Sequence, residues 1–208
     1  MAETDARERI LEAACDLIAA EGIDDVRIAR VAMRARASTA LVHHYFSTRE
    51  ELLEQALLHS FEQAGDERFA EDVAGSGSAL AGLALAIEEC LPVPGRAERD
   101  WVLWVELWLR AAREPDLRPL AAKLYERYQE WMVGVIEAGV RSGEFAAPAD
   151  VAALADRAMA MLDGLGLRAL LRDPALDLDR ARALVADLFA AELGVDSDEL
   201  LALRPSLG

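Results

Sequence analysis

Apolar residues recur at helical spacing from the start of the chain, which predicts short amphipathic helices rather than strands. The first helix begins near Asp5, which forms a capping box with Glu8, and it ends at Gly22. A second short helix begins after Asp25 and breaks at residues 35–37. Its predicted inward face consists of Ile28, Val31 and Ala32.

Two capping signals mark the helices that follow. Ser38 caps a third helix over residues 39–45, and Ser47 and Glu50 form a second capping box that opens a fourth. The inward side chains predicted for these two helices are Val42, Phe46, Leu53, Ala56, Leu57 and Phe61. Two short helices joined by a tight turn, as the second and third are, are typical of a helix-turn-helix unit.

Longer helices are predicted in the rest of the chain, because glycine and proline punctuation leaves long uninterrupted segments between them. These segments lie near residues 78–91, 98–113, 116–142, 149–172 and 179–193. The segment 149–172 is apolar nearly all round, which predicts a buried helix. After Gly194 a short acidic stretch leads to a tail that is expected to be loose. The pattern predicts an all-α protein of about nine helices, with domains over residues 1–47 and 48–208.

The distribution of charge changes this picture. With 38 acidic and 22 basic residues the net charge is −16, which would repel nucleic acid if it were evenly spread. Residues 26–49 instead contain five arginines and no acid, so this window carries +5 and the rest of the chain −21. A charged run is commonly just a solvated helix face, but this one coincides with the predicted helix-turn-helix. The distribution therefore favours a DNA-binding N-terminal domain.

The segment from Val31 to Leu52 resembles the TetR family of bacterial transcription regulators. The matching residues are Val31, Ala32, Ala35, Ser38, Tyr45, Phe46, Arg49, Glu50, Glu51 and Leu52. Arg36 stands where the family usually has glycine, so the turn must accept a bulky residue, with a positive φ as one option. The C-terminal half, with Trp-Val-Glu-Leu-Trp at 104–108, is similar to the subgroup that includes the choline-responsive repressors. The resemblance implies a three-helix helix-turn-helix domain followed by a helical domain that binds an effector and dimerises.

In a helix-turn-helix, the second helix of the unit enters the major groove with its N-terminal end first. Thr39, Ala40 and Leu41 are then predicted to face base edges, where threonine can hydrogen bond and the apolar pair can contact a thymine methyl group. Arg27 and Arg49 stand at helix starts and are predicted to contact phosphate. The predicted DNA-binding residues are Arg27, Arg30, Ser38, Thr39, Ala40, Leu41, His43, His44, Tyr45 and Arg49. The alternative for Thr39 and the two histidines is ordinary surface polarity.

Aromatic residues suggest a second site, for a small-molecule effector. Stripes of aromatic residues at helical spacing are commonly plain core, but facing aromatic side chains also suit a flat or cationic ligand. Asp163 lies in mid-helix in an apolar segment, where it either pairs with an arginine or lines the cavity. Glu106 is expected to form an exposed pair with Arg110, four residues on. The predicted effector site comprises Trp104, Trp108, Tyr128, Trp131, Met132 and Asp163.

Several function classes have little support. The only cysteines, Cys15 and Cys90, have no nearby histidine partner, and no phosphate loop or zinc-binding pattern occurs. Adjacent His43 and His44 would point about 100° apart on a helix, which disfavours a shared metal. We therefore expect no catalysis, no metal and no cofactor. The longest apolar run has nine residues, 79–87, where a membrane span needs about 20. The N-terminal residues lack the basic and then apolar order that is typical of a signal peptide. A cytoplasmic protein without membrane contact is expected.

A homodimer is expected, because one helix-turn-helix covers too little surface for specific DNA binding. The predicted pairing surface on the last two long helices is Ala155, Ala158, Gly164, Gly166, Leu184, Val185, Leu188 and Phe189. The alternative is that these helices only cap the monomer core. The predicted function is a sequence-specific transcription regulator, a repressor that a small molecule releases from a palindromic operator in double-stranded DNA. The rival hypothesis is an all-helical ligand-binding or scaffold protein that does not bind DNA.

Overall fold

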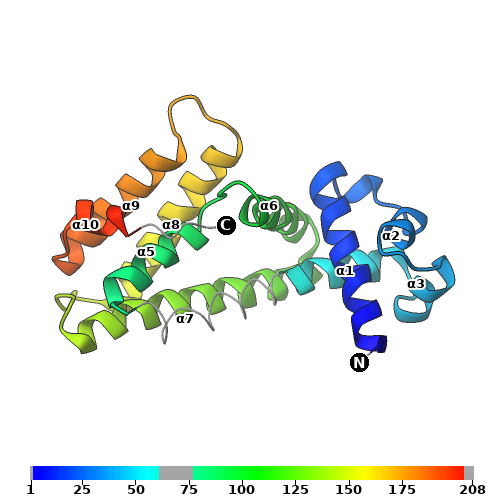
Figure 1. The fold of residues 1–208 in the computed structure, drawn as a ribbon, viewed down its shortest axis with the longest axis horizontal. Helices are drawn as coiled ribbons and strands as arrows, with labels where there is room; N and C mark the ends of the chain where they lie inside the picture. Colours follow the sequence, from blue (N-terminus) through cyan, green and yellow to red (C-terminus); the bar gives the residue numbers. More distant parts are fainter. Residues whose placement is uncertain (1, 61–76, 204–208) are drawn as a thin grey trace. The chain divides into compact units, whose positions relative to one another are not determined.

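The computed structural model describes residues 2–60 and 77–203, and every regular element within these ranges is helical. In chain order the elements are α1 (Ala2–Glu21), η1 (Ile23–Asp25), α2 (Ile28–Arg34), α3 (Thr39–Tyr45), a helix over residues 49–60, α5 (Ala79–Glu89), α6 (Arg96–Arg113), η2 (Pro115–Leu117), α7 (Arg118–Ser142), α8 (Val151–Leu170), α9 (Leu178–Leu193) and α10 (Ser197–Ala202) (Figure 1). The predicted all-α class is confirmed. The chain forms two compact units, one of residues 1–64 and 99–121, the other of residues 65–98 and 122–208.

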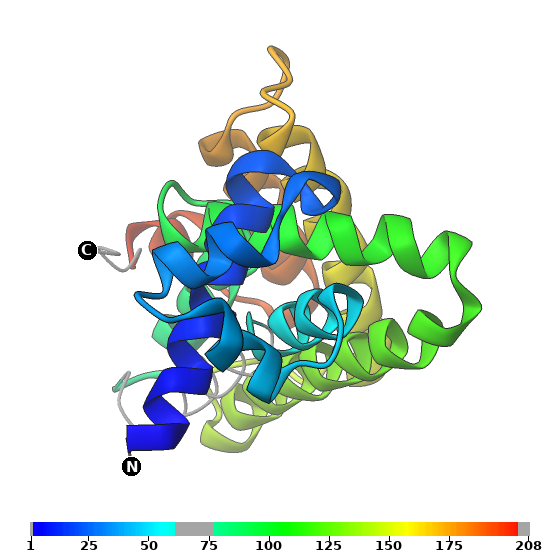
Figure 2. The same ribbon diagram turned by 90° about the vertical axis from the view of Figure 1, so that its right-hand side faces the viewer.

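In the first unit, the N-terminal helices pack around a small apolar core. Helix α1 lies beside the shorter α2 and α3, and α2 packs on α3 (Figure 2). The helix over residues 49–60 closes this core with Leu52, Leu53, Ala56 and Leu57, which are at most 1% exposed. The predicted inward residues Val31, Ala32, Val42, Phe46, Leu53, Ala56 and Leu57 are all buried. Ile28 is only half-buried, because it stands at the first position of α2, and Phe61 lies outside the described residues.

The second unit is built on a larger core between α5, α7, α8, α9 and α10. Helices α8 and α9 pack along each other and α10 folds back on α9 and α5 (Figure 1). One buried ion pair ties α5 to α9, since Arg182 donates from Nε and Nη2 to the two carboxylate oxygens of Glu88 at 2.6 Å each. Both partners are at least nine-tenths buried, so the pair is enclosed by the apolar core around it.

The structure corrects the predicted helix boundaries at three places. Helix α1 already begins at Ala2, so Asp5 lies inside the helix rather than at its cap. The second capping box is shifted by one residue, because Thr48 Oγ1 accepts from the Glu51 backbone N–H at 3.0 Å. The acidic stretch after Gly194 forms α10, in which Leu200 is 1% exposed and anchors the short helix, while residues 204–208 of the tail expected to be loose lie outside the described residues.

Helix α8 also departs from its prediction as a helix buried on all sides. Asp156, Ala160 and Gly164 recur at four-residue spacing and are exposed, so one face of α8 is open in the single chain. This face looks apolar in the sequence because it contains alanine and glycine. It can nevertheless remain exposed, because these small residues do not require burial.

Candidate DNA-binding face and effector pocket

Helix α3 presents an exposed N-terminal end. As predicted, the Ser38 side chain accepts a hydrogen bond from the Leu41 backbone N–H at 3.1 Å and caps the helix. Val42 and Phe46 anchor the opposite face in the core. Of the other predicted contact residues on this helix, the exposed ones are Thr39, Ala40, His43 and His44, and the half-buried ones are Leu41 and Tyr45. The side chains at the N-terminal end are therefore accessible to a duplex.

The turn between α2 and α3 adopts a backbone conformation that glycine usually supplies. Arg36 has a φ of 52°, in the left-handed region, so the turn does hold a bulky residue at positive φ. The Ala37 N–H donates to the Ala32 carbonyl at 2.9 Å, which closes the end of α2. The Arg36 side chain is exposed, and among the described residues it has no ion-pair partner.

Carboxylates of α1 balance much of the charge in the basic window. Arg30 forms a bidentate ion pair with Glu21, and Arg34 Nη2 lies 2.7 Å from Asp16 Oδ2. The +5 counted over residues 26–49 therefore overstates the charge available to phosphate. The count missed this because α1 brings its acids to α2 from outside the window.

Arg49 is used inside the domain. Its Nη2 donates to the Ile23 carbonyl at 2.6 Å and its Nε to the Val26 carbonyl at 2.8 Å, so the guanidinium braces the connection between α1 and α2. Arg27 donates to the Asp24 carbonyl at 2.9 Å but remains exposed. These internal bonds give Arg49 a structural role, and the phosphate contact suggested by its place at a helix start stays a prediction.

The predicted aromatic residues fall in both units. On α6, in the first unit, Trp104 and Trp108 pack edge to face with ring centroids 5.2 Å apart. On α7, in the second unit, Tyr128 and Trp131 do the same at 6.2 Å. Met132 is 0% exposed and packs in the core of the second unit, and its contact with an effector stays a prediction.

Asp163 is held by a tyrosine. The Tyr125 hydroxyl on α7 donates to Asp163 Oδ2 on α8 at 3.0 Å. Burial raises the pKa of Asp163 to about 6, and the hydrogen bond from Tyr125 opposes this rise only in part. Burial and the neighbouring carboxyl together raise the pKa of Tyr125. Of the two options that the sequence left open, pairing with an arginine is not seen among the described residues.

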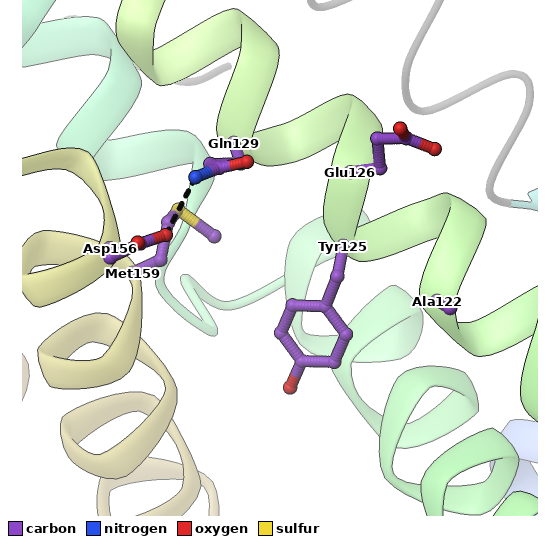
Figure 3. Close-up of a pocket in the computed structure, with 6 residues that line it drawn as sticks. All are labelled: Ala122, Tyr125, Glu126, Gln129, Asp156 and Met159. Atoms are coloured by element: carbon purple, nitrogen blue, oxygen red, sulfur yellow. Dashed lines mark hydrogen bonds between the residues drawn. The ribbon is translucent and has the colours of Figure 1, made fainter. Parts of the chain in front are cut away.

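An open pocket of about 440 Å³ lies between α7 and α8 (Figure 3). It is lined by Ala122, Tyr125, Glu126, Gln129, Asp156 and Met159. In Figure 3, Gln129 reaches from α7 toward α8, where its Nε2 donates to Asp156 Oδ1 at 2.7 Å. The charged lining residues are both carboxylates, and neither arginine nor lysine is among the lining residues. The pocket is therefore suited to a positively charged ligand.

Sequence reasoning found Asp163 but missed the pocket lining. A usable signal existed, because Tyr125 and Gln129 are four residues apart on α7, and Asp156, Met159 and Asp163 follow one face of α8. Periodicity alone could not show that these two faces meet, since that depends on how α7 packs against α8.

The residues predicted to pair two copies divide into two groups. Five are buried by their own chain: Ala155, Ala158, Gly166, Val185 and Phe189. Because their own chain covers these five, the pairing surface proposed below uses the other three residues. Gly164 is exposed with open space where a side chain would stand, and Leu184 and Leu188 are half-buried.

Three further observations concern metal-binding groups, membrane-spanning helices and the Cys15 thiol. Within residues 2–60 and 77–203, no group of three or more His, Cys, Asp and Glu side chains could hold a metal ion. No helix in the same ranges is long and apolar enough to cross a bilayer. The Cys15 thiol is buried and donates to the Ala56 carbonyl at 3.0 Å, and burial raises its pKa to about 12, which makes it a poor nucleophile.

Two family profiles match the sequence. Residues 10–56 match the profile described as bacterial regulatory proteins of the tetR family. Residues 79–194, more than half of the chain, match the profile described as the C-terminal domain of BetI-type transcriptional repressors. The first match covers the helix-turn-helix, and the second extends from α5 to the end of α9.

Individual relatives agree with these profiles. The HTH-type transcriptional regulator BetI 1 of Chromohalobacter salexigens is 28% identical over 194 residues, which is 90% of each chain. BetI of Agrobacterium fabrum is 27% identical and covers 90% of this chain and 87% of its own. A transcriptional regulator from Saccharomonospora viridis in complex with choline superposes with a TM-score of 0.80 at 30% identity, over 91% of this chain and 98% of that one. A TetR transcription regulator from Haloarcula marismortui gives a TM-score of 0.76 at 26% identity, over 91% and 99%.

Proposed function

The chain belongs to the TetR family of bacterial regulatory proteins and carries a BetI-type C-terminal domain, and from this premise we propose that an organic cation releases it from its operator. Membership makes it a helix-turn-helix transcriptional regulator of the repressor type, in a family that is not enzymatic. The effector, the DNA contacts and the dimer are proposed from the chain's own residues.

The proposed DNA contacts are the N-terminal end of α3 and the turn before it. Thr39, Ala40 and Leu41 read base edges, while Arg27 and Arg36 contact phosphate from exposed positions. His43, His44 and Tyr45 contribute further polar contacts along α3, and Ser38 caps the helix. Arg30 and Arg49 position the domain through Glu21 and through the carbonyls before α2. Selection of duplexes from a random pool should return a palindrome, and failure to select any sequence would favour the rival scaffold function.

The electrostatics of the pocket between α7 and α8 carry the effector proposal. Glu126 and Asp156 line the pocket, and Asp163 adds a third carboxyl through Tyr125. A bound cation would supply the charge that these groups lack, and the tyrosine ring offers a cation–π contact. The S. viridis regulator, whose structure contains choline, makes a quaternary ammonium compound the first candidate.

Titration calorimetry with choline and with 3,3-dimethyl-1-butanol, its uncharged isostere, tests this proposal. Choline should bind at least about tenfold more tightly, because only choline interacts with the carboxylates and the ring as a cation. Asp156→Asn should weaken choline binding. Glu137→Gln is the matched control, because this α7 carboxylate already pairs with Arg141 at 3.1 Å. Equal affinity for the two compounds, or no binding of any quaternary ammonium compound, would contradict a cation site.

Tryptophan fluorescence gives a second reading of the same event. We propose that the emission of the aromatic residues Trp104, Trp108, Tyr128 and Trp131 reports effector binding. One aromatic pair lies in each unit, so each unit has its own reporter. A variant that retains only Trp131 should still respond to choline, since Trp131 belongs to the unit that holds the pocket. Unchanged emission from this variant at saturation would place the site elsewhere.

The proposed homodimer uses the face of α8 and α9 that remains open in the single chain. Gly164 permits close approach of a second α8, and Leu184 and Leu188 retain exposed surface on α9. Two copies of this helix pair would form a four-helix bundle about a two-fold axis. Light scattering should show a dimer at micromolar concentration and a monomer for Leu188→Glu. A monomeric parent protein would contradict the model.

A further inference from the structure

A chain of ion pairs crosses the first unit from α6 to α2 through one carboxylate. Arg99 Nη1 on α6 donates to Asp16 Oδ1 at 2.9 Å. Arg34 on α2 donates to Asp16 Oδ2 from Nε at 3.0 Å and from Nη2 at 2.7 Å. Asp16, on α1, therefore holds one guanidinium on each oxygen. We propose that Arg99, Asp16 and Arg34 are positioning residues that couple the place of α6 to that of the recognition helix.

The α6 end of this relay is held on several sides. Arg99 Nη1 also donates to Glu12 Oε2 at 2.9 Å, and its Nη2 lies 3.3 Å from Asp100 Oδ1. Asp100 is buried and accepts from the Ser60 hydroxyl at 3.1 Å. His59, whose Nε2 lies 3.4 Å from Glu12 Oε1, and the hydrogen bond from Arg99 lower the pKa of Glu12 to about 2, so this partner is ionised at neutral pH. A shift of α6 along α1 must break or rearrange these bonds.

The α2 end of the relay lies next to the proposed DNA contacts. Arg34 is the last residue of α2, two positions before Arg36 and four before the Ser38 cap of α3. Val31 and Ala32, on the same helix, are buried in the core and hold α2 against it. A displacement of α2 therefore moves the turn and the N-terminal end of α3 with it. The step from a movement of α3 to a change in DNA binding rests on the proposed function.

Helix α6 has residues in both units, so a change in the second unit can reach the relay through this helix. Glu98, the residue before Arg99, belongs to the second unit and pairs there with Arg172, with Nη2 and Oε1 2.6 Å apart. Because Glu98 and Arg99 are adjacent residues of one helix, a displacement of Glu98 is expected to displace Arg99 as well.

A second ion pair on α2 provides an internal control. The Arg30 side chain is as exposed as that of Arg34, at 53%, and it too joins α2 to α1, through Glu21. Glu21 has no ion pair with α6 within the described ranges. If such half-exposed pairs only stabilised the fold, the two arginines would behave alike.

The test is a double-mutant cycle on DNA affinity between Arg99 and Arg34. Duplexes that the parent protein selects from a random pool serve as the probe, with dissociation constants measured by fluorescence anisotropy at one salt concentration. Arg99→Gln should weaken binding by about fivefold, and by less than about twofold once Arg34→Gln has broken the relay. Arg99→Gln and Arg30→Gln should act independently. Independent action of Arg99→Gln and Arg34→Gln would overturn the proposal.

Hydrogen exchange of the DNA-free protein provides a readout that does not depend on the proposed function. Amides of residues 28–45 should exchange about fivefold faster in Arg99→Gln, with no further increase when Arg34→Gln is added. Asp16→Asn should reproduce the double variant. If the parent protein selects no DNA, the proposed function fails, while unchanged exchange over residues 28–45 would overturn the relay itself. Should Arg99→Gln not fold, Arg99→Lys keeps the charge but not the forked geometry and takes its place in both measurements.

Discussion

The junction of α1, α2 and α6 and the pocket between α7 and α8 use charge in opposite ways. At the junction the carboxylates meet guanidinium groups, with Asp16 bound by two arginines and Glu12 by Arg99. At the pocket Asp156 and Asp163 accept hydrogen bonds from neutral side chains, Gln129 and Tyr125, and neither pairs with a cation among the described residues.

This difference shows which charges a fold leaves available. Paired charges at the junction orient helices and contribute little net attraction for a ligand. A carboxylate without a cationic partner gains most when a cationic ligand arrives, and Asp163 is such a group, because burial disfavours its charged form. The number of charged residues in a segment therefore says little about binding until the neighbours in space are known.

The largest expected effect is at the junction. Arg99→Ala should lower the free energy of unfolding by about 2 kcal/mol, because it leaves buried Asp100 and the two α1 carboxylates without their guanidinium. Urea denaturation at neutral pH measures this change. Arg110→Ala, which removes an exposed pair with Glu114, should change stability by less than about 0.5 kcal/mol. Equal effects of the two variants would remove the distinction between the junction and an ordinary surface.

At the pocket, removal of a charge should raise the free energy of unfolding rather than lower it. Because burial raises the pKa of Asp163 to about 6, its ionisation destabilises the folded state, and this penalty grows as pH rises from the unfolded value through about 6. Asp163→Asn should therefore stabilise the protein by roughly 1.5 kcal/mol at about pH 8, allowing for partial exposure of the group. The gain should vanish near about pH 4, where the carboxyl is protonated in both states. Thermal unfolding across this pH range that shows no pH-dependent gain would contradict the raised pKa.

The effector should sharpen the same contrast. A bound cation stabilises the ionised form of Asp163, so choline affinity should fall as pH drops through about 6. The expected weakening between about pH 7.5 and pH 5 is up to about tenfold, or 1.4 kcal/mol. Calorimetry of the parent protein and of Asp163→Asn measures it, since the variant should bind choline more weakly and lose this pH dependence. A dependence that persists in the variant would have to come from another group.

The smallest effects are expected on the DNA face, where Arg36 is exposed and has no ion-pair partner among the described residues. Arg36→Gln should weaken all duplexes alike by about 1 kcal/mol and reduce the salt slope by about one unit, as loss of a phosphate contact does. Thr39→Ala should instead change preference among duplexes. Arg49→Ala is the contrast, because its guanidinium braces backbone carbonyls, so it should lower stability and leave the salt slope unchanged. A reduced salt slope for Arg49→Ala would restore its role as a phosphate ligand.

The local features of the N-terminal helices were predictable because they depend on neighbours along the chain. The Ser38 cap, the end of α1 at Gly22 and the buried Val42 follow from rules that act within one or two turns. The positive φ at Arg36 was only one option, which the family resemblance raised. The pocket was only partly predictable. Asp163 was conspicuous as a charge within an apolar segment, whereas exposed Tyr125 and Asp156 became significant only through the packing of α7 on α8.

The sequence by itself determined the all-α class, the helix-turn-helix and its place in a family, because periodicity, caps and turn residues are local and leave a direct imprint on residue order. Tertiary structure decided which charges remain free. Arg34 and Arg49, both in the basic window, are engaged by Asp16 and by backbone carbonyls from elsewhere in the chain, and Ala155 and Phe189 face their own core rather than a second copy. The reason is that burial and electrostatic pairing depend on distances in space, which a helix face acquires only when another helix packs against it.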